Sequence, residues 1–199
     1  MKTGSSESRK RPTKKYPTIA ACGLDCGLCP RFYTIGSSRC PGCAGAGFYE
    51  KRPTCSFITC CVKTKKLEVC SECPDFPCSR FKSAGEYPRK KDVPSYPSYK
   101  KVLPNLYFIQ KYGLKKYLDQ QKKRIRILET MISSFDDGRS RSFFCRAANS
   151  YDISALAQSI KKAKNIIEKE ERGSTEAMDT RAKARILKTI LDEIPLTGK

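Results

Sequence analysis

The sequence predicts a mainly α-helical protein, in which a small irregular cysteine-rich module packs against a C-terminal three-helix bundle. Three observations lead to this fold class. Eleven of the twelve cysteines fall between Cys22 and Cys78, prolines and tyrosines crowd the stretch that follows, and apolar residues recur at helical spacing from Asn105 onward. We therefore expect four parts: a disordered basic tail (1–18), the cysteine-rich module (19–82), a Pro/Tyr-rich strap (83–104) and a helical region (105–199).

The composition is that of a soluble globular protein. The chain has 199 residues, of which 39% are hydrophobic and 30% charged. It contains no run of about 18 apolar residues, as a membrane span requires, and its first residues lack the apolar core of a signal peptide. We expect a cytoplasmic protein without membrane contact.

The formal net charge of +20 is concentrated in the first residues and in the C-terminal half. Residues 1–15 contain Lys, Arg, Ser and Gly but no apolar anchor, which predicts a disordered tail. The basic tail and basic helix faces could contact a protein partner or a polyanion such as nucleic acid. The alternative is that these charges are only solvated.

The cysteines fall into four groups: Cys22/Cys26/Cys29, Cys40/Cys43, Cys55/Cys60/Cys61 and Cys70/Cys73/Cys78. A reducing cytosol keeps thiols unpaired, so this density indicates metal ligation more than disulfides. In the first group, Gly23 and Gly27 permit tight turns whose N–H groups point at sulfur. Asp25, between the cysteines, either caps the next turn or lies in solvent.

Few large apolar residues accompany these cysteines. Phe57, Phe76 and Phe81 are the expected apolar cover of the metal sites, and a module this short needs metal to fold. The segment from Val62 to Val69 fits a short helix or a strand, and its periodicity does not decide between them.

The cysteine pattern resembles a known family. The run from Cys22 to Pro30, then Cys40-x-Gly-Cys43, Cys55 to Cys60, and Cys70-x-x-Cys73-x-x-Phe76-Pro77-Cys78 are similar to DUF3795, a cysteine-rich family of unknown function from anaerobic bacteria and methanogenic archaea. The similarity extends to Asn105-Leu106, Tyr112-Gly113-Leu114 and the run from Phe135 to Cys145, and so covers most of residues 19–172.

The resemblance implies metal binding, without an assigned reaction. Cys61 stands outside the family's ligand string, and the basic tail and the last helix look like additions. The ten expected metal ligands are Cys22, Cys26, Cys29, Cys40, Cys43, Cys55, Cys60, Cys70, Cys73 and Cys78.

Two metal centres suit these ligands. Closed four-thiolate zinc sites use Cys-x2-Cys half-sites, while [4Fe-4S] clusters use the same ligands with looser spacing. The chain has no histidine, which excludes mixed Cys/His sites and histidine-based catalysis. We favour Zn²⁺, with [4Fe-4S] clusters as the alternative, supported by the anaerobic setting of the family.

The helical region shows three amphipathic stretches. The first carries an apolar stripe formed by Leu114, Leu118, Ile125, Leu128 and Ile132, with lysines and arginines on its other faces. The second begins at the N-cap Asp152 and ends at Gly173, and the third runs from about Thr175 to Pro195. The strap before them is too rich in proline for a helix, and we expect its tyrosines to pack on the helical part.

Between the first two stretches, Asp137-Gly138 predicts a turn, followed by a short segment with Ser140, Ser142 and Cys145 that lies on the bundle surface or against the metal module. Cys145 is either a small buried hydrophobe, a distant metal ligand or a reactive thiol.

Three function classes remain open. The favoured one is a cysteine-rich zinc protein that acts as a binding or interaction module, with nucleic-acid binding as one version of it. The second is an iron–sulfur protein in electron transfer or redox sensing. The third, an enzyme reacting through Cys145, Cys61 or an open metal position, is the weakest because no recognisable acid or base accompanies these centres.

Overall fold

A computed structural model describes residues 11–84, 99–173 and 176–194, and it is mainly helical, as predicted. Within these residues the only β pairing is an isolated antiparallel bridge between Ile19 and Asp25. None of the helices in this part of the chain has the length and apolar character to span a membrane.

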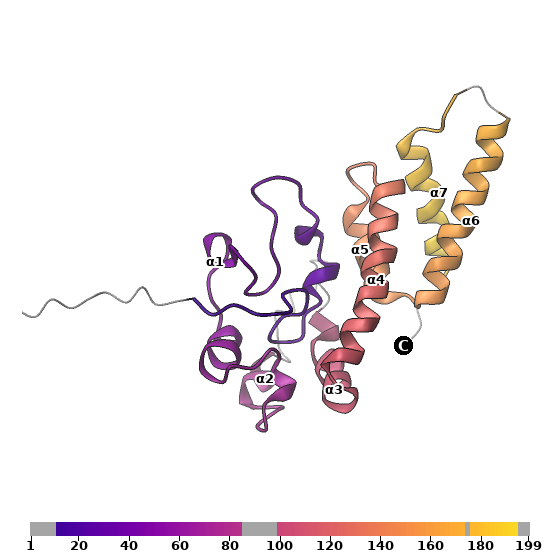
Figure 1. Cartoon of the computed structure of the whole chain (residues 1–199). Coiled ribbons are helices and arrows are strands. Elements are labelled where there is room, and N and C mark those ends of the chain that lie inside the picture. Colours follow the sequence, from indigo (N-terminus) through magenta and orange to yellow (C-terminus); the bar gives the residue numbers. More distant parts are fainter. Residues whose placement is uncertain (1–10, 85–98, 174–175, 195–199) are drawn as a thin grey trace, which may run out of the picture.

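The cysteine-rich part consists of short helical turns joined by loops. These are η1 (Cys26–Leu28), η2 (Pro30–Phe32), α1 (Phe48–Lys51), η3 (Ile58–Thr64), η4 (Cys70–Glu72) and α2 (Ser79–Ala84). The helical region contains η5 (Tyr99–Lys101), α3 (Val102–Tyr112), α4 (Leu114–Phe135), α5 (Arg141–Ser150), α6 (Ile153–Arg172) and α7 (Thr180–Asp192). The cysteine-rich part lies on one side of α3 and α4, and α6 and α7 lie on the other (Figure 1).

The three long helices predicted from periodicity are present as α4, α6 and α7, but the helical region has two more. One is α3, which begins within the predicted strap because Pro104 falls in its first turn, where no backbone N–H is needed. The other is α5, which follows the Asp137-Gly138 turn where a short segment on the bundle surface or against the cysteine-rich module was expected. The predicted tyrosine contacts of residues 85–98 lie outside the described residues.

The segment from Val62 to Val69 is neither an extended helix nor a strand. Its first residues complete the wide, π-type turn η3, and Lys66 has a left-handed backbone with φ of 57°. π-type turns are frequent at functional sites. Here the turn carries Cys60 and Cys61.

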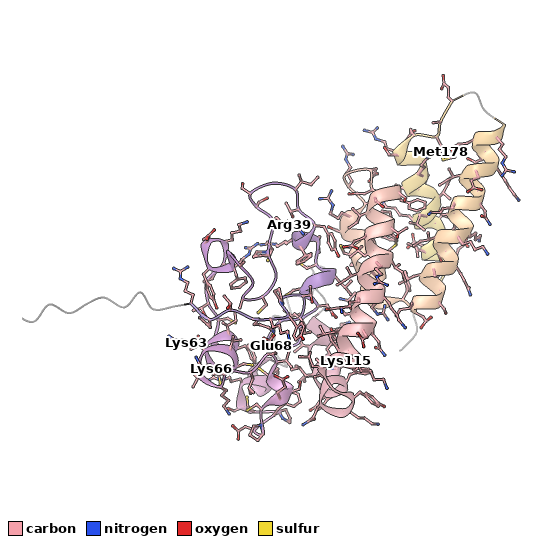
Figure 2. The ribbon with its side chains drawn as sticks, viewed as in Figure 1. Arg39, Lys63, Lys66, Glu68, Lys115 and Met178 are labelled. Carbon is pink, nitrogen blue, oxygen red and sulfur yellow. The ribbon has the colours of Figure 1, made fainter. Side chains whose placement is uncertain are left out.

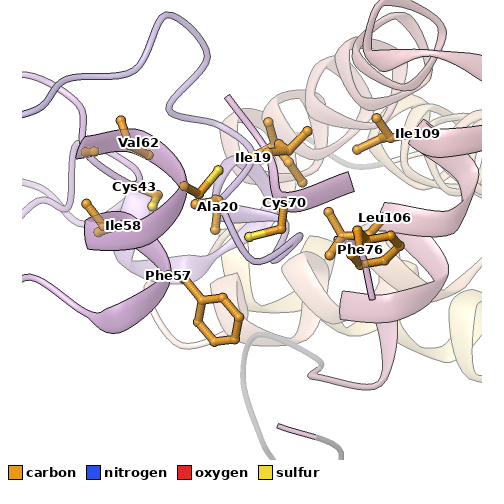
Figure 3. Packing of buried hydrophobic residues seen from close by; sticks show 14 of the residues in the cluster. Ile19, Ala20, Cys43, Phe57, Ile58, Val62, Cys70, Phe76, Leu106 and Ile109 are labelled. Carbon is orange, nitrogen blue, oxygen red and sulfur yellow. The ribbon is translucent and has the colours of Figure 1, made fainter. Parts of the chain in front are cut away.

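Two hydrophobic clusters form the core, and α4 belongs to both. Its first half places Tyr117 and Leu118 in a cluster with the cysteine-rich part, where Cys43 and Cys70 lie among Ile19, Ala20, Phe76 and Leu106 (Figure 3). Its second half packs with α5, α6 and α7. Leu28 from η1, 1% exposed, inserts into this second cluster. The cysteine-rich part is therefore anchored on α4 at two levels.

Both glycines of the first cysteine group touch the helices. A Cβ on Gly23, whose φ is +93°, would lie 2.6 Å from the Val102 carbonyl oxygen, and one on Gly27 would lie 2.8 Å from Ile125 Cδ1. Close packing, more than turn conformation, therefore explains why position 27 is a glycine.

The disordered tail expected over residues 1–18 is too long, because its last residues are held in the structure by hydrogen bonds. Residues 1–10 lie outside the description, but Lys14 is 7% exposed, and its Nζ donates to the carbonyl oxygens of Ile19 at 2.7 Å and Glu68 at 2.6 Å. The Glu68 carboxylate accepts from the N–H groups of Lys15 and Tyr16. Figure 2 shows Glu68 beside Lys63 and Lys66 in the cysteine-rich part, far from Met178 at the α6–α7 connection.

Candidate metal centre

Five cysteines line one small cavity, which we call the thiol cavity. Its volume is about 20 Å³, and its walls are formed by Cys60, Cys61, Cys70, Cys73, Cys78, Lys65, Arg80 and three phenylalanines. All five thiols come from residues 60–78: Cys60 and Cys61 belong to η3, Cys70 belongs to η4, and Cys73 and Cys78 lie in the loop between η4 and α2. The cavity is thus built by the local turns of the chain.

Each of these turns is held by backbone hydrogen bonds. The η3 turn brings Cys60 and Cys61 to the wall, and the Cys61 thiol lies 3.5 Å from the Leu67 carbonyl oxygen. The η4 turn is fixed to the first cysteine loop because the Cys70 N–H donates to the Ala21 carbonyl at 2.9 Å. Cys78 precedes α2 directly.

The predicted apolar cover surrounds the thiol cavity. Phe57, Phe76 and Phe81 all line it, with ring centroids 4.9 Å apart for Phe57 and Phe81 and 5.3 Å for Phe76 and Phe81. Phe57, Phe76 and Phe81 are 8%, 7% and 4% exposed. Cys61 and Cys70 are buried beside these rings, whereas Cys60, Cys73 and Cys78 are partly exposed.

Cys61, which the family's ligand string leaves out, lies against Cys70. The two thiols form a hydrogen bond that lowers the pKa of Cys61 and raises the pKa of Cys70. One buried polar side-chain atom in the described residues has no hydrogen-bond partner, and it is Ser71 Oγ in the turn between Cys70 and Cys73.

A lysine contacts the rim of the cavity. Lys65 Nζ donates to Cys73 Sγ at 2.9 Å and to Asp75 Oδ2 at 2.5 Å. The hydrogen bond to Asp75 and then that to Cys73 raise the pKa of Lys65, and the Lys65 ammonium lowers the pKa of Asp75. The Lys65 ammonium is therefore placed to stabilise the negative charge of a Cys73 thiolate.

A second group contains Cys22, Cys26, Cys43 and Cys55, which we call the knuckle cysteines. Burial raises the pKa of Cys22 to about 12 and also raises the pKa values of Cys26 and Cys43, and neighbouring thiols of the group add to this effect. The backbone N–H of Leu24 faces the Cys22 sulfur, and that of Cys43 faces the Cys26 sulfur. Such N–H groups facing sulfur match the arrangement expected for the first cysteine group.

Lys14 joins the two groups. Burial raises the pKa of Cys43, from the knuckle cysteines, and the Lys14 ammonium opposes this effect. The Cys70 hydrogen bond lowers the pKa of Cys61, from the thiol cavity, and the same ammonium adds to that effect. A buried lysine needs hydrogen bonds and compensating negative charge. Its position fits a place between two sets of thiolates.

The remaining predicted ligands, Cys29 and Cys40, lie near each other, and Cys29 also lies near Cys26. The Cys40 charge raises the pKa of Cys29, after the larger effect of burial. Cys40 is held near this turn because its N–H donates to the Arg31 carbonyl at 2.8 Å. In the three described ranges, no three Cys, Asp or Glu side chains converge closely enough to hold one metal ion.

Cys145 lies apart from all these thiols. It is 0% exposed in the second cluster, between α5 and the other helices. The structure therefore agrees with the interpretation of Cys145 as a buried hydrophobe. The segment that carries it is the helix α5, which packs against η1 and η2 of the cysteine-rich part, the second of the two expected places.

Asp25 is neither a helix cap nor solvated, contrary to both expectations. It is 7% exposed, and its side chain makes no capping hydrogen bond to η1. Its carboxylate accepts from Asn105 Nδ2 at 2.9 Å, from Gln121 Nε2 at 3.0 Å and from the Tyr117 hydroxyl. A carboxylate between two cysteines carries no sequence signal for this role, since all three donors come from helices more than seventy positions away.

Comparisons with known proteins bear on this region. No curated protein and no solved structure matches the chain. Residues 18–83 match the family model described as "Protein of unknown function (DUF3795)", whereas the resemblance expected from Asn105 to Cys145 falls outside the match. The matched segment holds the thiol cavity, the knuckle cysteines, and Cys29 and Cys40. The resemblance expected from the cysteine pattern is therefore confirmed as a match of residues 18–83 to the DUF3795 family model.

Proposed function

We propose that this protein binds zinc through cysteine thiolates, and that the thiol cavity is one of its metal sites. The observation that carries the proposal is that five thiols and three phenylalanines line one small cavity. Thiolates are the preferred ligands of zinc in structural sites. A cytoplasmic setting, which keeps thiols reduced, is part of the proposal.

The size of the cavity favours one ion over a cluster. A volume of about 20 Å³ corresponds to roughly one water-sized body. No three of the described thiols already lie close enough to hold one ion, so zinc binding would draw the sulfurs inward to about 2.3 Å from the metal. A four-iron cluster would require the same walls to move apart. The ligands would be Cys60, Cys70, Cys73 and Cys78, with Cys61 beside them.

The knuckle cysteines are the proposed second site. Cys22, Cys26, Cys43 and Cys55 supply four sulfurs, and Lys14 stands between this site and the thiol cavity. Two four-thiolate zinc sites carry about −4 in total, so the cations Lys14 and Lys65 would offset part of that charge. Cys29 and Cys40 remain as spare or exchanging ligands.

The chemistry of such sites is structural. Zinc with four thiolates has no open position for a substrate, so its contribution is to hold the chain together. Here it would fix η3, η4 and the first cysteine turn to one another. The unpaired Ser71 hydroxyl is a donor available to a metal-bound sulfur in the Cys70–Cys73 turn. The protein then serves as a rigid binding module.

Elemental analysis of anaerobically purified protein tests this proposal. We expect about two zinc ions per chain, no absorbance near 400 nm, and loss of one zinc in Cys70→Ser or Cys78→Ser. Cys145→Ser is the matched control and should keep both ions. If the purified protein contains iron and absorbs visible light, the sites hold iron–sulfur clusters and the zinc proposal is wrong. A chain that binds neither metal after reconstitution would also refute the proposal.

A polyanion or an acidic protein is the proposed partner of the basic helix α4. Lys115, Lys116, Lys122 and Lys123 are all exposed on this helix. Opposite charge attracts them to a phosphate backbone, in a contact that weakens as salt rises. Binding of duplex DNA and of heparin at increasing salt tests this, with Lys122→Glu/Lys123→Glu as the variant. Absence of salt-dependent binding would leave these lysines as a solvated face.

A further inference from the structure

A concave polar pocket lies where the first cysteine turn meets α3, α4 and α5. Its volume is about 230 Å³, and the residues that matter for its chemistry are Asp25, Lys101, Asn105, Tyr117, Gln121 and Arg124. The pocket is distinct from the thiol cavity, with which it shares no residue. We refer to it as the polar pocket.

The wall of the polar pocket is rigid. Asp25 accepts hydrogen bonds from Asn105, Tyr117 and Gln121, and Gln121 Nε2 also reaches the Thr18 carbonyl oxygen at 3.0 Å. Arg124 is fixed as well, because its Nη1 donates to the carbonyl oxygens of Ala148 and Tyr151, both at 2.7 Å. Side chains held in this way are preorganised for a ligand.

The charges of the pocket are unbalanced. Its lining holds two cations, Lys101 and Arg124, but one carboxylate, Asp25, which already accepts three side-chain hydrogen bonds. Burial, followed by repulsion from Arg124, lowers the pKa of Lys101, and burial lowers the pKa of Arg124. Asp152, whose charge also reaches Arg124, is exposed and caps α6. A bound anion would relieve this excess of positive charge.

We propose that the polar pocket binds a small molecule through an oxyanion group, a carboxylate or a phosphate, held by Lys101 and Arg124. Guanidinium and ammonium groups form strong charge-assisted hydrogen bonds with such groups. The volume lies below the roughly 300 Å³ of the smallest drug-sized pockets, so the ligand is a small metabolite. Phe108 and Pro104 offer an apolar wall to its carbon skeleton. The proposal does not depend on metal binding.

Nuclear magnetic resonance titration of the full chain provides the test. The probes are inorganic phosphate, acetate and succinate, each at millimolar concentration and constant ionic strength. The side-chain amide signals of Gln120 and Asn149, which line the pocket, should shift in a saturable way with at least one probe. The probe that binds then distinguishes a phosphate ligand from a carboxylate ligand.

Lys101→Gln and Lys100→Gln form a matched pair of variants. Lys100 is the preceding residue in η5, is exposed and does not line the pocket. Lys101→Gln should weaken binding roughly tenfold or more, since a hydrogen bond to a charged group is lost, while Lys100→Gln should bind as the wild type does. Lys101→Arg keeps the charge and should bind within a few fold of the wild type.

Three outcomes would overturn the proposal. They are no saturable shift with any probe, equal weakening by Lys100→Gln, and binding by Lys101→Arg as weak as that by Lys101→Gln. Metal content measured on the same samples separates this result from the zinc proposal, because anion binding should persist whichever metal the cysteines hold.

Discussion

Asn105 Nδ2 donates to Asp25 Oδ2 at 2.9 Å and to the Gly23 carbonyl oxygen at 2.9 Å, across 80 positions of sequence in the first case. This one amide joins both halves of the first cysteine turn to α3. The turn is further held by Tyr117 and Gln121 from α4. The helical region therefore determines the shape of a loop that carries expected metal ligands.

Replacing Asp25 with Asn should destabilise the protein by about 2–4 kcal/mol, because a buried acceptor of three hydrogen bonds becomes partly a donor. Urea unfolding followed by circular dichroism measures the loss. Asp119→Asn is the control, since Asp119 pairs with Lys115 on the exposed side of α4 and should have almost no effect. Equal changes in the two variants would contradict a structural role for Asp25.

Gly23→Ala should lower the free energy of unfolding by more than the strain of its positive φ alone explains. Gly23 and Gly138 both have positive φ, +93° and +82°, but only Gly23 is close to other atoms, with Leu106 Cγ at 2.7 Å from an added Cβ. We expect a loss of about 1 kcal/mol for Gly138→Ala and about 2–4 kcal/mol for Gly23→Ala. The difference between the two free energies of unfolding isolates the contact with α3. A difference near zero would show that the loop can move away.

Cys145→Ser should leave metal content unchanged while lowering stability by about 1–2 kcal/mol, because a hydroxyl replaces a thiol in an apolar core. The Cys145 side chain is 0% exposed. In the native protein, its thiol should react with a disulfide reagent only after unfolding. Rapid labelling of Cys145 in the folded chain, located by mass spectrometry, would contradict this burial.

The long helices could be predicted from sequence because their apolar stripes are long and regular. The periodicity from Leu114 to Ile132 lies within α4, and Asp152 caps α6 as expected by accepting from the Ser154 N–H. The shorter α3 and α5 could not be predicted in this way. Pro104 obscures the start of α3, and α5 has only 10 residues, so its apolar stripe is too short to stand out from the surrounding sequence.

The candidate site was predictable to the same limited degree. Cysteine spacing and the scarcity of large apolar residues correctly suggested that Phe57, Phe76 and Phe81 cover thiols. Spacing alone could not show that Cys61 shares the wall with Cys70, since adjacent cysteines point in directions set by the η3 turn. The polar network of Asp25 depends on contacts between distant segments, which periodicity and local motifs do not encode.

The stability of α7 should depend on the ionisation of its cap. Asp179 accepts from the N–H groups of Arg181 at 2.5 Å and Ala182 at 3.0 Å, and these bonds lower the pKa of its carboxyl. Because folding depresses this pKa, the stabilisation is present above the unfolded value near 4 and is lost as the pH falls through the lower folded value. Asp179→Asn should therefore differ from the wild type at neutral pH and converge with it in acid. A constant difference across pH, measured by urea unfolding, would contradict this.

Removal of metal should loosen the cysteine-rich part and leave the far helices intact. The first hydrophobic cluster includes Cys43, Cys61 and Cys70, whereas α6 and α7 pack against α4 in the second cluster, which holds no expected ligand. Metal-binding energy is folding energy where the ligands are drawn from flexible turns. Amide hydrogen exchange after treatment with a strong chelator should show lost protection in η3 and η4 and retained protection in α6.

Re-addition of zinc, but not of magnesium, should restore the protection of η3 and η4, because thiolates select soft or borderline ions over hard ones. The stability of the first hydrophobic cluster would then depend on the metal, while that of the second cluster would not. Loss of protection in α6 together with η3 would show instead that the two clusters unfold as one unit, through Leu28 and the shared helix α4. Unchanged protection after complete removal of metal would show that the phenylalanines and backbone hydrogen bonds hold the thiol cavity without it.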